Sequence, residues 1–393
     1  MPGRLALHHR RLSKRRRSLK YWIGQLHLWL GLASGLVVFV VSLTGCLFVF
    51  QQEISNVWYK DRFFVAPAPG TRPLSELLHR AGTALGEPVD YITTYADPHR
   101  AWECMSYKSN DTALTYFGAM ERYRSVYLDP HTGRITGFRN YKYDFFVLVK
   151  YLHWSLLLNT PYGQPVVAWS TLVFVLLLIS GLVLWWPKRR SKASRRQAFS
   201  VRWSARFKRL NYDLHNVLGF YVLLVALVIS LTGMVFAFDW FSRAVSRVGS
   251  GSTAQSLFSP VRLPSSGNVL DEAFAVVQRL QPEARRIGVA PSAGADSILS
   301  FSAYSGRETY YDREDFRFGR TSGSMTSWSL LAREDFAHRN AGDKLINMNY
   351  DIHVGAIGGL PGKVIAFLAC LVCASLPVTG FLVWWGKKRR ART

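Results

Sequence analysis

The sequence predicts a membrane α-helical protein: a four-helix transmembrane bundle made of two parallel repeats, each with an α+β domain inserted outside the membrane. Three observations support this fold class. Four long stretches lack Lys, Arg, Asp and Glu, the excess positive charge lies in short segments beside them, and the pattern of the first half of the chain recurs in the second.

The four uncharged stretches are each long enough to cross a bilayer. A helix needs about 20 apolar residues to span a hydrocarbon core of about 30 Å. The chain of 393 residues is 49% hydrophobic, which suits a mixture of membrane and soluble parts. The uncharged stretches are Tyr21–Gln52, Tyr151–Pro187, Leu214–Phe238 and Val364–Gly386.

The net charge of +24 is concentrated beside these stretches. Residues 1–20, 188–212 and 387–393 contain no acidic residue and hold 23 of the 24 excess charges. Basic residues flank spans on the cytoplasmic side, so both termini are expected in the cytoplasm. Because the charge is explained by topology, no nucleic-acid partner is expected. Paired tryptophans at 185–186 and 384–385 suit a membrane interface.

The expected order of segments follows from this topology. The first stretch is too long for a signal-peptide core and should remain as an anchor. The segments are a basic cytoplasmic tail (1–20), span one (21–52), an outer domain (53–148), an outer histidine segment with span two (149–187), a basic cytoplasmic loop (188–212), span three (213–240), a second outer domain (241–345), an outer histidine segment with span four (346–386) and a basic cytoplasmic tail (387–393).

The two outer segments have the patterns of small α+β domains. Helical spacing of apolar residues is found at 72–87 and 268–280, and "LDPHTGRI" has the signals of a hairpin turn. Neither segment contains a nucleotide-phosphate loop, a nucleophile elbow or a zinc-ligand cluster. Strand-like runs are expected at 90–95, 101–108 and 121–138 in the first segment and at 297–304 and 307–319 in the second.

The four cysteines give little functional information. Cys46, Cys370 and Cys373 fall in spans and are expected to pack as small apolar residues, although "CLVC" also resembles a redox or metal pair. Cys104 is the only cysteine expected outside the membrane, so no disulfide framework is predicted for the outer domains.

Spans one and three repeat a common pattern. His27 and His215 are each followed four residues later by a glycine, Gly31 or Gly219, and then by an identical Ser-Leu-Thr-Gly. Spans two and four also match, with a histidine before the apolar run and a Pro/Gly break after it. Both halves enter the membrane in the same direction, which indicates a pseudo-twofold axis along the membrane normal.

The repeat arranges four histidines as two pairs. His27 and His215 lie near the cytoplasmic ends of their spans, whereas His153 and His353 lie at the outer entry to theirs. Ionisable residues within a membrane are candidates for a functional site. Two facing imidazoles can supply the axial ligands of a haem iron in a bundle core, so we expect two haem groups. The alternative is a neutral imidazole hydrogen-bonded to a neighbouring helix, copied by duplication.

Gly31 and Gly219 are candidate cofactor-binding positions beside the inner pair. Each lies one turn from its histidine on the same helix face, where it would leave room for a flat macrocycle. Close packing of helices explains these glycines equally well. Metal transport is less favoured, because no carboxylate or thiolate accompanies the histidines at their depth.

Four sequence stretches together resemble the PepSY-associated transmembrane family of bacterial inner-membrane proteins, over about residues 18–390. They are "LHLWLGL…SLTG", "SVYLDPHTGRI…YLHWSLL…GLVLWWPKR", "LHNVLGF…SLTG" and "DIHVGAIGG…TGFLVWWGKKR". The resemblance implies periplasmic PepSY-type domains and, as in the family's ferric-siderophore reductases, two b-type haems on His27, His153, His215 and His353. The second outer segment departs from the pattern, since residues 309–319 lack the Asp-x-x-Thr-Gly of "LDPHTG".

The resemblance implies an electron-transfer protein that reduces a periplasmic acceptor, a ferric siderophore from which iron is released as Fe(II). Some relatives carry a fused flavin/nicotinamide module; this sequence ends soon after span four, so a cytoplasmic reductase or a membrane quinol is expected as donor. Trp154, Tyr162 and Tyr350 are expected near the outer site, where they could line the acceptor's docking surface. Two alternatives stay open: a non-enzymatic membrane scaffold with peptide- or protease-binding outer domains, and an iron or siderophore permease.

Overall fold

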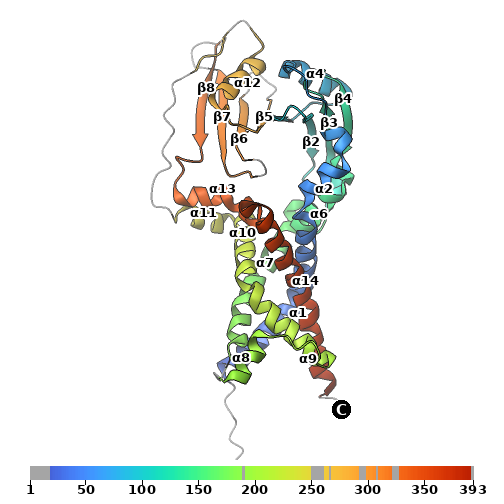
Figure 1. Cartoon of the computed structure of the whole chain (residues 1–393), viewed down its shortest axis with the longest axis vertical. Helices are drawn as coiled ribbons and strands as arrows, with labels where there is room; N and C mark the ends of the chain where they lie inside the picture. The colour runs from blue at the N-terminus through green and yellow to red at the C-terminus, as the bar shows by residue number, and fades with distance from the viewer. Residues whose placement is uncertain are drawn as a thin grey trace, which may run out of the picture.

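The computed structural model describes residues 18–187, 191–248, 261–264, 267–291, 298–306, 309–320 and 327–390. A bundle of long helices carries an antiparallel sheet beyond one end (Figure 1). Residues 1–17, 188–190 and 391–393 of the predicted basic segments lie outside the described residues. So do residue 297 and residues 307–308 of the expected strands.

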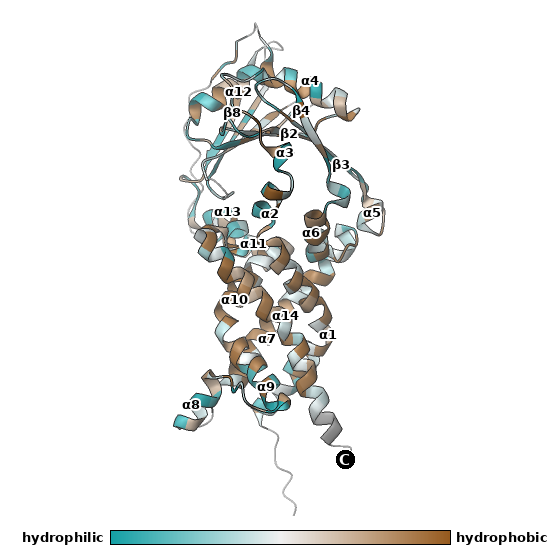
Figure 2. Ribbon diagram, turned by 45° about the vertical axis from the view of Figure 1, so that its right-hand side comes forward, coloured by the Kyte–Doolittle hydropathy of each residue, from teal (hydrophilic) through white to brown (hydrophobic). Residues whose placement is uncertain are grey.

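Four helices are long and apolar enough to cross a membrane, as predicted. Helix α1 contacts α7 and α14, and α10 contacts the same two helices, so α1 lies diagonally opposite α10. Large apolar side chains such as Leu36 and Leu224 are exposed, as a lipid-facing surface requires. The long helices of the bundle are mostly brown in Figure 2, which marks their hydrophobic residues. The long helices are α1 (Leu19–Phe48), α7 (Thr160–Trp185), α10 (Gly219–Ala237) and α14 (Gly359–Arg390).

The expected strands of both outer segments join with two strands that were not predicted, β5 and β8, in one eight-stranded antiparallel sheet. Its order is β4-β3-β2-β1-β5-β6-β7-β8, and β1 and β5 pair at its centre. The turn predicted for "LDPHTGRI" joins β3 to β4, where the Gly133 amide donates to the Asp129 carbonyl at 2.8 Å. The strands are β1 (Tyr91–Tyr95), β2 (Trp102–Ser109), β3 (Met120–Leu128), β4 (Ile135–Asn140), β5 (Arg286–Ala290), β6 (Leu299–Tyr304), β7 (Arg313–Arg320) and β8 (Trp328–Asp335).

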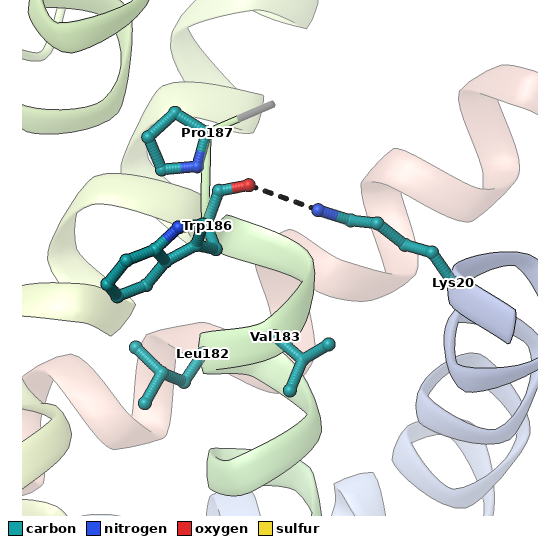
Figure 3. Close-up of a pocket in the computed structure, with 5 residues that line it drawn as sticks. All are labelled: Lys20, Leu182, Val183, Trp186 and Pro187. Carbon is teal, nitrogen blue, oxygen red and sulfur yellow. Dashed lines mark hydrogen bonds between the residues drawn. The ribbon is translucent and has the colours of Figure 1, made fainter. Parts of the chain in front are cut away.

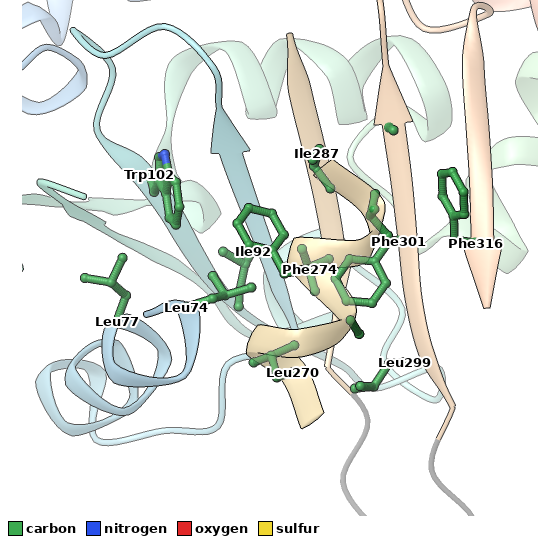
Figure 4. Close-up of a cluster of buried hydrophobic side chains, with 14 of the residues drawn as sticks. Leu74, Leu77, Ile92, Trp102, Leu270, Phe274, Ile287, Leu299, Phe301 and Phe316 are labelled. Carbon is green, nitrogen blue, oxygen red and sulfur yellow. The ribbon is translucent and has the colours of Figure 1, made fainter. Parts of the chain in front are cut away.

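The core of the outer part lies on the sheet face that points away from the bundle. Two amphipathic helices, α4 (Leu74–Leu85) and α12 (Val269–Leu280), cover this face, close to the two predicted helical segments. Ile92, Phe274 and Phe301 are among the buried side chains between these helices and the sheet (Figure 4). Complete burial of such a side chain stabilises the fold by about 1.5–3 kcal/mol. The opposite face of the sheet is therefore left to face the bundle.

Two short helices connect the sheet to the second and fourth spans. These are α6 (Phe145–Ser155) and α13 (Ala341–His353), and each folds back sharply into the helix that follows. A Cβ atom at Gly163 would overlap the Ser155 carbonyl, so the α6–α7 bend needs a glycine there. Gly355, after α13, has φ of +77°, a conformation that favours glycine.

The remaining short elements lie at the two ends of the bundle. At the sheet end they are α2 (Gln51–Trp58), α3 (Lys60–Phe63), α5 (Tyr116–Ala119) and α11 (Asp239–Ser246). At the opposite end they are α8 (Lys192–Phe199) and α9 (Phe207–Asp213) (Figure 1). A single π-helical turn, Leu214–Leu218, joins α9 to α10 and contains His215. Such turns are often found at functional sites.

Candidate functional site: two histidine pairs in the bundle

The structure brings the four membrane histidines together in two pairs. The ring centroids of His27 and His215 are 6.4 Å apart, with the ring planes at 86°. Those of His153 and His353 are 6.1 Å apart, with the planes at 73°. Each pair joins diagonally opposite parts of the bundle: α1 faces the π turn before α10, and α6 faces α13. These are the pairs that the sequence analysis assigned to the same leaflet.

These separations suit two imidazoles that share one metal ion. Metal–nitrogen bonds of about 2.0–2.1 Å, with about 1.1 Å from each nitrogen to its ring centre, place two opposed rings roughly 6.2–6.4 Å apart. Both centroid distances fall in or close to this range. Direct ring–nitrogen hydrogen bonding between the partners would require a shorter separation. The residues therefore fit a bis-imidazole metal site at both levels of the bundle.

The Nδ1 atom of each histidine is engaged by a neighbouring helix. The Nδ1 atoms of His153, His215 and His353 lie 2.8, 3.1 and 3.1 Å from backbone carbonyl oxygens of Val41, Leu376 and Ile229. A carbonyl only accepts, so Nδ1 carries the proton in these rings and Nε2 keeps its lone pair. This is the tautomer in which Nε2 can bind a metal.

The Nδ1 atom of each of the four histidines also lies beside a hydroxyl group of a neighbouring helix. All four hydroxyl oxygens lie 2.9–3.2 Å from the histidine Nδ1, and each hydroxyl donates its own proton to a carbonyl one turn earlier in its helix. The hydroxyl oxygen is therefore left to accept from Nδ1–H. The partners are Ser180 for His27, Thr44 for His153, Thr379 for His215 and Thr232 for His353.

Each of these hydroxyl residues is followed by a glycine that packs against the same imidazole. A Cβ atom at Gly45, Gly181, Gly233 or Gly380 would lie 3.3, 3.4, 3.5 or 3.1 Å from the Cε1 atom of its histidine. The hydroxyl–glycine dipeptide is thus a clasp that fixes one imidazole. The repeated Thr-Gly is visible in the sequence, but no role was predicted for it. The repetition in spans one and three was the signal for this contact.

Gly31 and Gly219, the predicted cofactor-binding glycines, face neighbouring helices. A Cβ atom at Gly31 would lie 3.8 Å from a Leu177 methyl, and one at Gly219 would lie 3.6 Å from a Leu376 methyl. Both positions have ordinary van der Waals surroundings, so helix packing accounts for them.

A second motif precedes two of the histidines and was also missed. The sequence is Asn-Tyr-Asp-Leu-His at 211–215 and Asn-Tyr-Asp-Ile-His at 349–353. The Nδ2 atom of Asn211 donates to the Thr379 carbonyl and that of Asn349 to the Thr232 carbonyl, both at 3.0 Å. Each asparagine thus ties its own helix to the residue that clasps the histidine.

The aspartates of this motif are both fully buried but have different partners. Asp213 pairs with Arg209 at 2.9 Å. Asp351 accepts hydrogen bonds from the backbone amides of Tyr310 and Tyr311, each at 2.8 Å, and so connects the outer histidine helix to the sheet side.

The outer pair opens into a cavity of about 1570 Å³ between the sheet and the bundle. His153 and His353 both line it, whereas His27 and His215 do not. Around the outer pair its walls carry many small side chains, which leaves room for a bulky group. These small residues include Ser42, Gly45, Ala168, Ser170, Ala226, Ser230 and Gly233.

Two of the three aromatic residues predicted to border the outer site do so. Trp154 and Tyr350 line the cavity. Tyr162 is not among its lining residues; it lies in the first turn of α7 and is half exposed.

A smaller groove of about 430 Å³ lies at the opposite end of the bundle, lined by Lys20, Leu182, Val183, Trp186 and Pro187. The Lys20 ammonium donates to the Trp186 carbonyl at 3.1 Å and links the start of α1 to the end of α7 (Figure 3). This groove has apolar walls and one cation, as is common at a membrane interface.

Other metal-binding chemistry is absent from the part of the chain that the structure describes. No group of three or more His, Cys, Asp or Glu side chains there could hold a metal ion. The four cysteines are free, and Cys46 and Cys373 are buried among apolar neighbours in the bundle. The histidine pairs are therefore the main candidate ligands.

Residues 25–387 match the family model of the PepSY-associated TM region. The chain belongs to this family. No curated protein matches the chain at a significant level. The family match contains both histidine pairs, the whole sheet, α7, α10 and most of α1 and α14, so the site described above lies within the family region.

Proposed function

We propose that this PepSY-associated membrane protein is a di-haem b electron-transfer protein of a bacterial inner membrane. His27 and His215 would hold one haem, and His153 and His353 the other. It would reduce a periplasmic acceptor, a ferric siderophore whose iron is released as Fe(II). The observation that supports this most directly is the pair of facing imidazoles at each level, each imidazole held by a hydroxyl–glycine clasp.

Haem iron held by an imidazole on each face changes oxidation state without an open coordination position, and this suits electron transfer. The protein's own contribution is to fix the imidazoles. A carbonyl and a hydroxyl from the adjacent helix hold the His353 Nδ1–H at 3.1 and 2.9 Å, which sets the ring's tautomer and direction. Hydrogen bonds of this kind also raise the basicity of the ligand nitrogen.

The proposed orientation places the sheet in the periplasm and both termini in the cytoplasm. It is supported by the basic sequence segments 1–20, 188–212 and 387–393, whose described parts, residues 18–20, 191–212 and 387–390, belong to the end of the bundle opposite the sheet (Figure 1). We also propose that the chain arose by internal duplication. The strand order supports this, since four strands from each half extend outward from the β1–β5 pair.

The acceptor would bind in the cavity above the outer pair, beside Trp154 and Tyr350. Electrons would be supplied at the inner pair by a cytoplasmic reductase or a membrane quinol. No acid–base group is required of the chain, because transfer to a chelated Fe(III) moves one electron and leaves the ligand bonds of the protein unchanged.

An absorption spectrum of the purified full-length protein tests the proposal. We expect a Soret band that shifts on reduction with dithionite, and two haems per chain by pyridine haemochrome assay. Replacement of all four membrane histidines by alanine should abolish the band. The control is His79→Ala on the exposed surface of α4, which should leave the spectrum unchanged.

The same preparation separates the alternatives. A scaffold would purify without haem. A permease would carry iron across proteoliposomes without changing its valence, whereas the proposed reductase would yield Fe(II) that ferrozine traps on the sheet side. A spectrum that survives loss of the four histidines would refute the ligand assignment.

A further inference from the structure

The cavity above the outer histidine pair has an unbalanced charge. Two of its lining residues are acidic, Asp97 and Glu103. Six are basic: Arg100, Arg139, Lys150, Arg285, Arg286 and Lys363. These side chains come from the sheet, from α6 and from the start of α14, so the positive charge surrounds the cavity.

Part of this charge is neutralised within the protein. Arg139 pairs with Asp144 at 2.9 Å, and Lys363 pairs with Glu53 at 2.7 Å. The Glu103 carboxylate accepts hydrogen bonds from the hydroxyls of Tyr127 and Tyr141. These contacts account for two of the cations and one of the acids.

The other four cations have no carboxylate partner among the described residues. Arg286 is the most informative of them, because its Nη2 atom is buried and no described hydrogen-bond acceptor reaches it. A buried guanidinium nitrogen without an acceptor is unfavourable unless a ligand supplies one. Arg286 stands on β5, at the centre of the sheet face that looks toward the outer histidines.

The cavity is also unusually aromatic. The Arg286 guanidinium lies 4.3 Å from the ring centre of Tyr304 and 4.4 Å from that of Tyr310, and these two rings limit its orientation. Nine tyrosines line the cavity: Tyr91, Tyr95, Tyr123, Tyr127, Tyr141, Tyr151, Tyr304, Tyr310 and Tyr350. Aromatic rings of this kind bind the faces and edges of aromatic ligands.

We infer that this cavity selects a multiply anionic, aromatic metal chelate of the tris(catecholate) class, with Arg286 and Lys150 as principal anion contacts. The inference deepens the proposed function by naming the class of acceptor. Reduction of the bound chelate rests on that proposed function. A bare cation is disfavoured by the positive lining. A neutral tris(hydroxamate) chelate would bring no counter-charge to the unpaired cations. The cavity exceeds the roughly 300–1,000 Å³ of ordinary ligand pockets, which leaves volume for a chelate beside a group held by the outer histidines.

Gallium(III) chelates test binding separately from reduction, because gallium(III) is not reduced under these conditions. The full-length protein in nanodiscs of zwitterionic lipid is titrated with gallium tris(catecholate), gallium tris(hydroxamate) and inorganic phosphate, and binding is followed by calorimetry. We expect the trianionic catecholate chelate to bind at least about tenfold more tightly than the neutral hydroxamate, with an affinity that falls as salt is added.

Two variants locate the contact. Arg286→Gln and Lys150→Gln should each weaken catecholate binding by about tenfold or more, as loss of a charge-assisted hydrogen bond does. Arg80→Gln, on α4 beyond the opposite face of the sheet, makes the same charge change and should leave affinity unchanged. If Arg286→Gln does not fold, the affinity of Lys150→Gln for the catecholate chelate and the salt dependence of wild-type binding still test the inference.

The results distinguish this inference from the proposed function. Equal binding of the hydroxamate chelate would overturn the inference, as would phosphate binding as tight as that of catecholate, or no response to either variant. Catecholate selectivity in a protein that purifies without haem would support the inference while the proposed function fails. Absence of selectivity in a protein with two haems would support the proposed function and overturn the inference.

Discussion

The inner and outer histidine pairs have the same internal construction but different surroundings. In both, ring centroids are about 6 Å apart, a hydroxyl–glycine dipeptide clasps each imidazole, and an Asn-Tyr-Asp-x-His segment supplies one of the two rings. The outer pair borders a cavity of about 1570 Å³ with a tyrosine-rich wall, whereas the inner pair lines neither of the cavities described above.

The two pairs hold their imidazoles in the same way but differ in their access to a ligand. The clasp uses only residues of adjacent spans, so it works equally at either end of the bundle. Access depends on what lies beyond the bundle, and only one end has the sheet. Under the proposed function, the inner pair would receive electrons away from this cavity, and the outer pair would deliver them to a ligand inside it.

The largest expected effect comes from removing one ligand of one pair. Because each pair has its own histidines and its own clasps, although α1 contributes residues to both, His215→Ala and His353→Ala should each reduce the haem content from two per chain to one. The pyridine haemochrome assay on purified variants measures this. Loss of both haems from either single variant would contradict the independence of the two sites.

Removal of a clasping hydroxyl should have a smaller effect that differs between the pairs. Thr379→Val and Thr232→Val each delete an oxygen that accepts from a histidine Nδ1. Loss of such a partner typically weakens metal binding by about 10–100-fold. We expect the inner variant, Thr379→Val, to show the full effect, because water from the cavity can replace the missing oxygen beside His353.

Haem transfer to excess apomyoglobin measures this difference as a rate. The control is Ser375→Ala, which removes a hydroxyl from the same helix, α14, that bonds only to the Val372 carbonyl. Equal acceleration by Thr379→Val and Thr232→Val would show that access to the cavity does not affect the clasp.

The glycines of the clasp offer a finer comparison. A methyl group at Gly380 would lie 3.1 Å from the His215 Cε1 atom, which is close enough to force the ring to move, whereas at Gly233 it would lie 3.5 Å from that of His353. Gly380→Ala should therefore shift the low-spin ferric signal in electron paramagnetic resonance, and Gly233→Ala should change it little.

Gly386→Ala is the matched control for these variants. A Cβ atom there meets nothing within 4 Å, so the substitution should leave both haem signals unchanged. It should stabilise α14 by roughly 0.5–1 kcal/mol, the usual difference between alanine and glycine within a helix. A larger shift from Gly233→Ala than from Gly380→Ala would contradict the contact distances.

Much of the fold could be predicted from local patterns in the sequence. The spans follow from uncharged apolar stretches, and the turn between β3 and β4 follows from Asp129, Pro130 and Gly133. The histidine pairing followed from the repeat, because equivalent positions in two parallel halves lie at the same depth. Strands β5 and β8 were not predicted. Strand β5 is only five residues long, and its central place depends on pairing with β1, nearly 200 residues earlier.

The details of the site depend on how helices are rotated against each other, which a single sequence does not give. Gly31 and Gly219 lie one turn from their histidines, but the helix crossings turn them toward Leu177 and Leu376. Tyr162 lies close in sequence to His153, yet the α6–α7 bend turns it out of the cavity. The repeated Thr-Gly was visible in the sequence, but its contact with the histidine of another span required the structure.

The smallest expected effect is a pH dependence confined to the outer end. Lys150 lies on α6 beside the cavity, and burial lowers the pKa of its ammonium group from its ordinary value of 10.5. The charged form attracts an anion, so affinity for gallium tris(catecholate) should fall as pH rises through this lowered pKa. Burial raises the pKa of Tyr91 and Tyr350, which therefore stay neutral over the pH range in which Lys150 loses its proton.

The arginines of the cavity remain charged over the same pH range, so the loss should be partial, within about tenfold. Calorimetric titrations at a series of pH values should show the decrease in the wild type and a flat profile in Lys150→Gln. Binding of the neutral hydroxamate chelate should not change with pH in either protein. An identical slope in Lys150→Gln would mean that another group titrates, and Lys150 would then not be an anion contact.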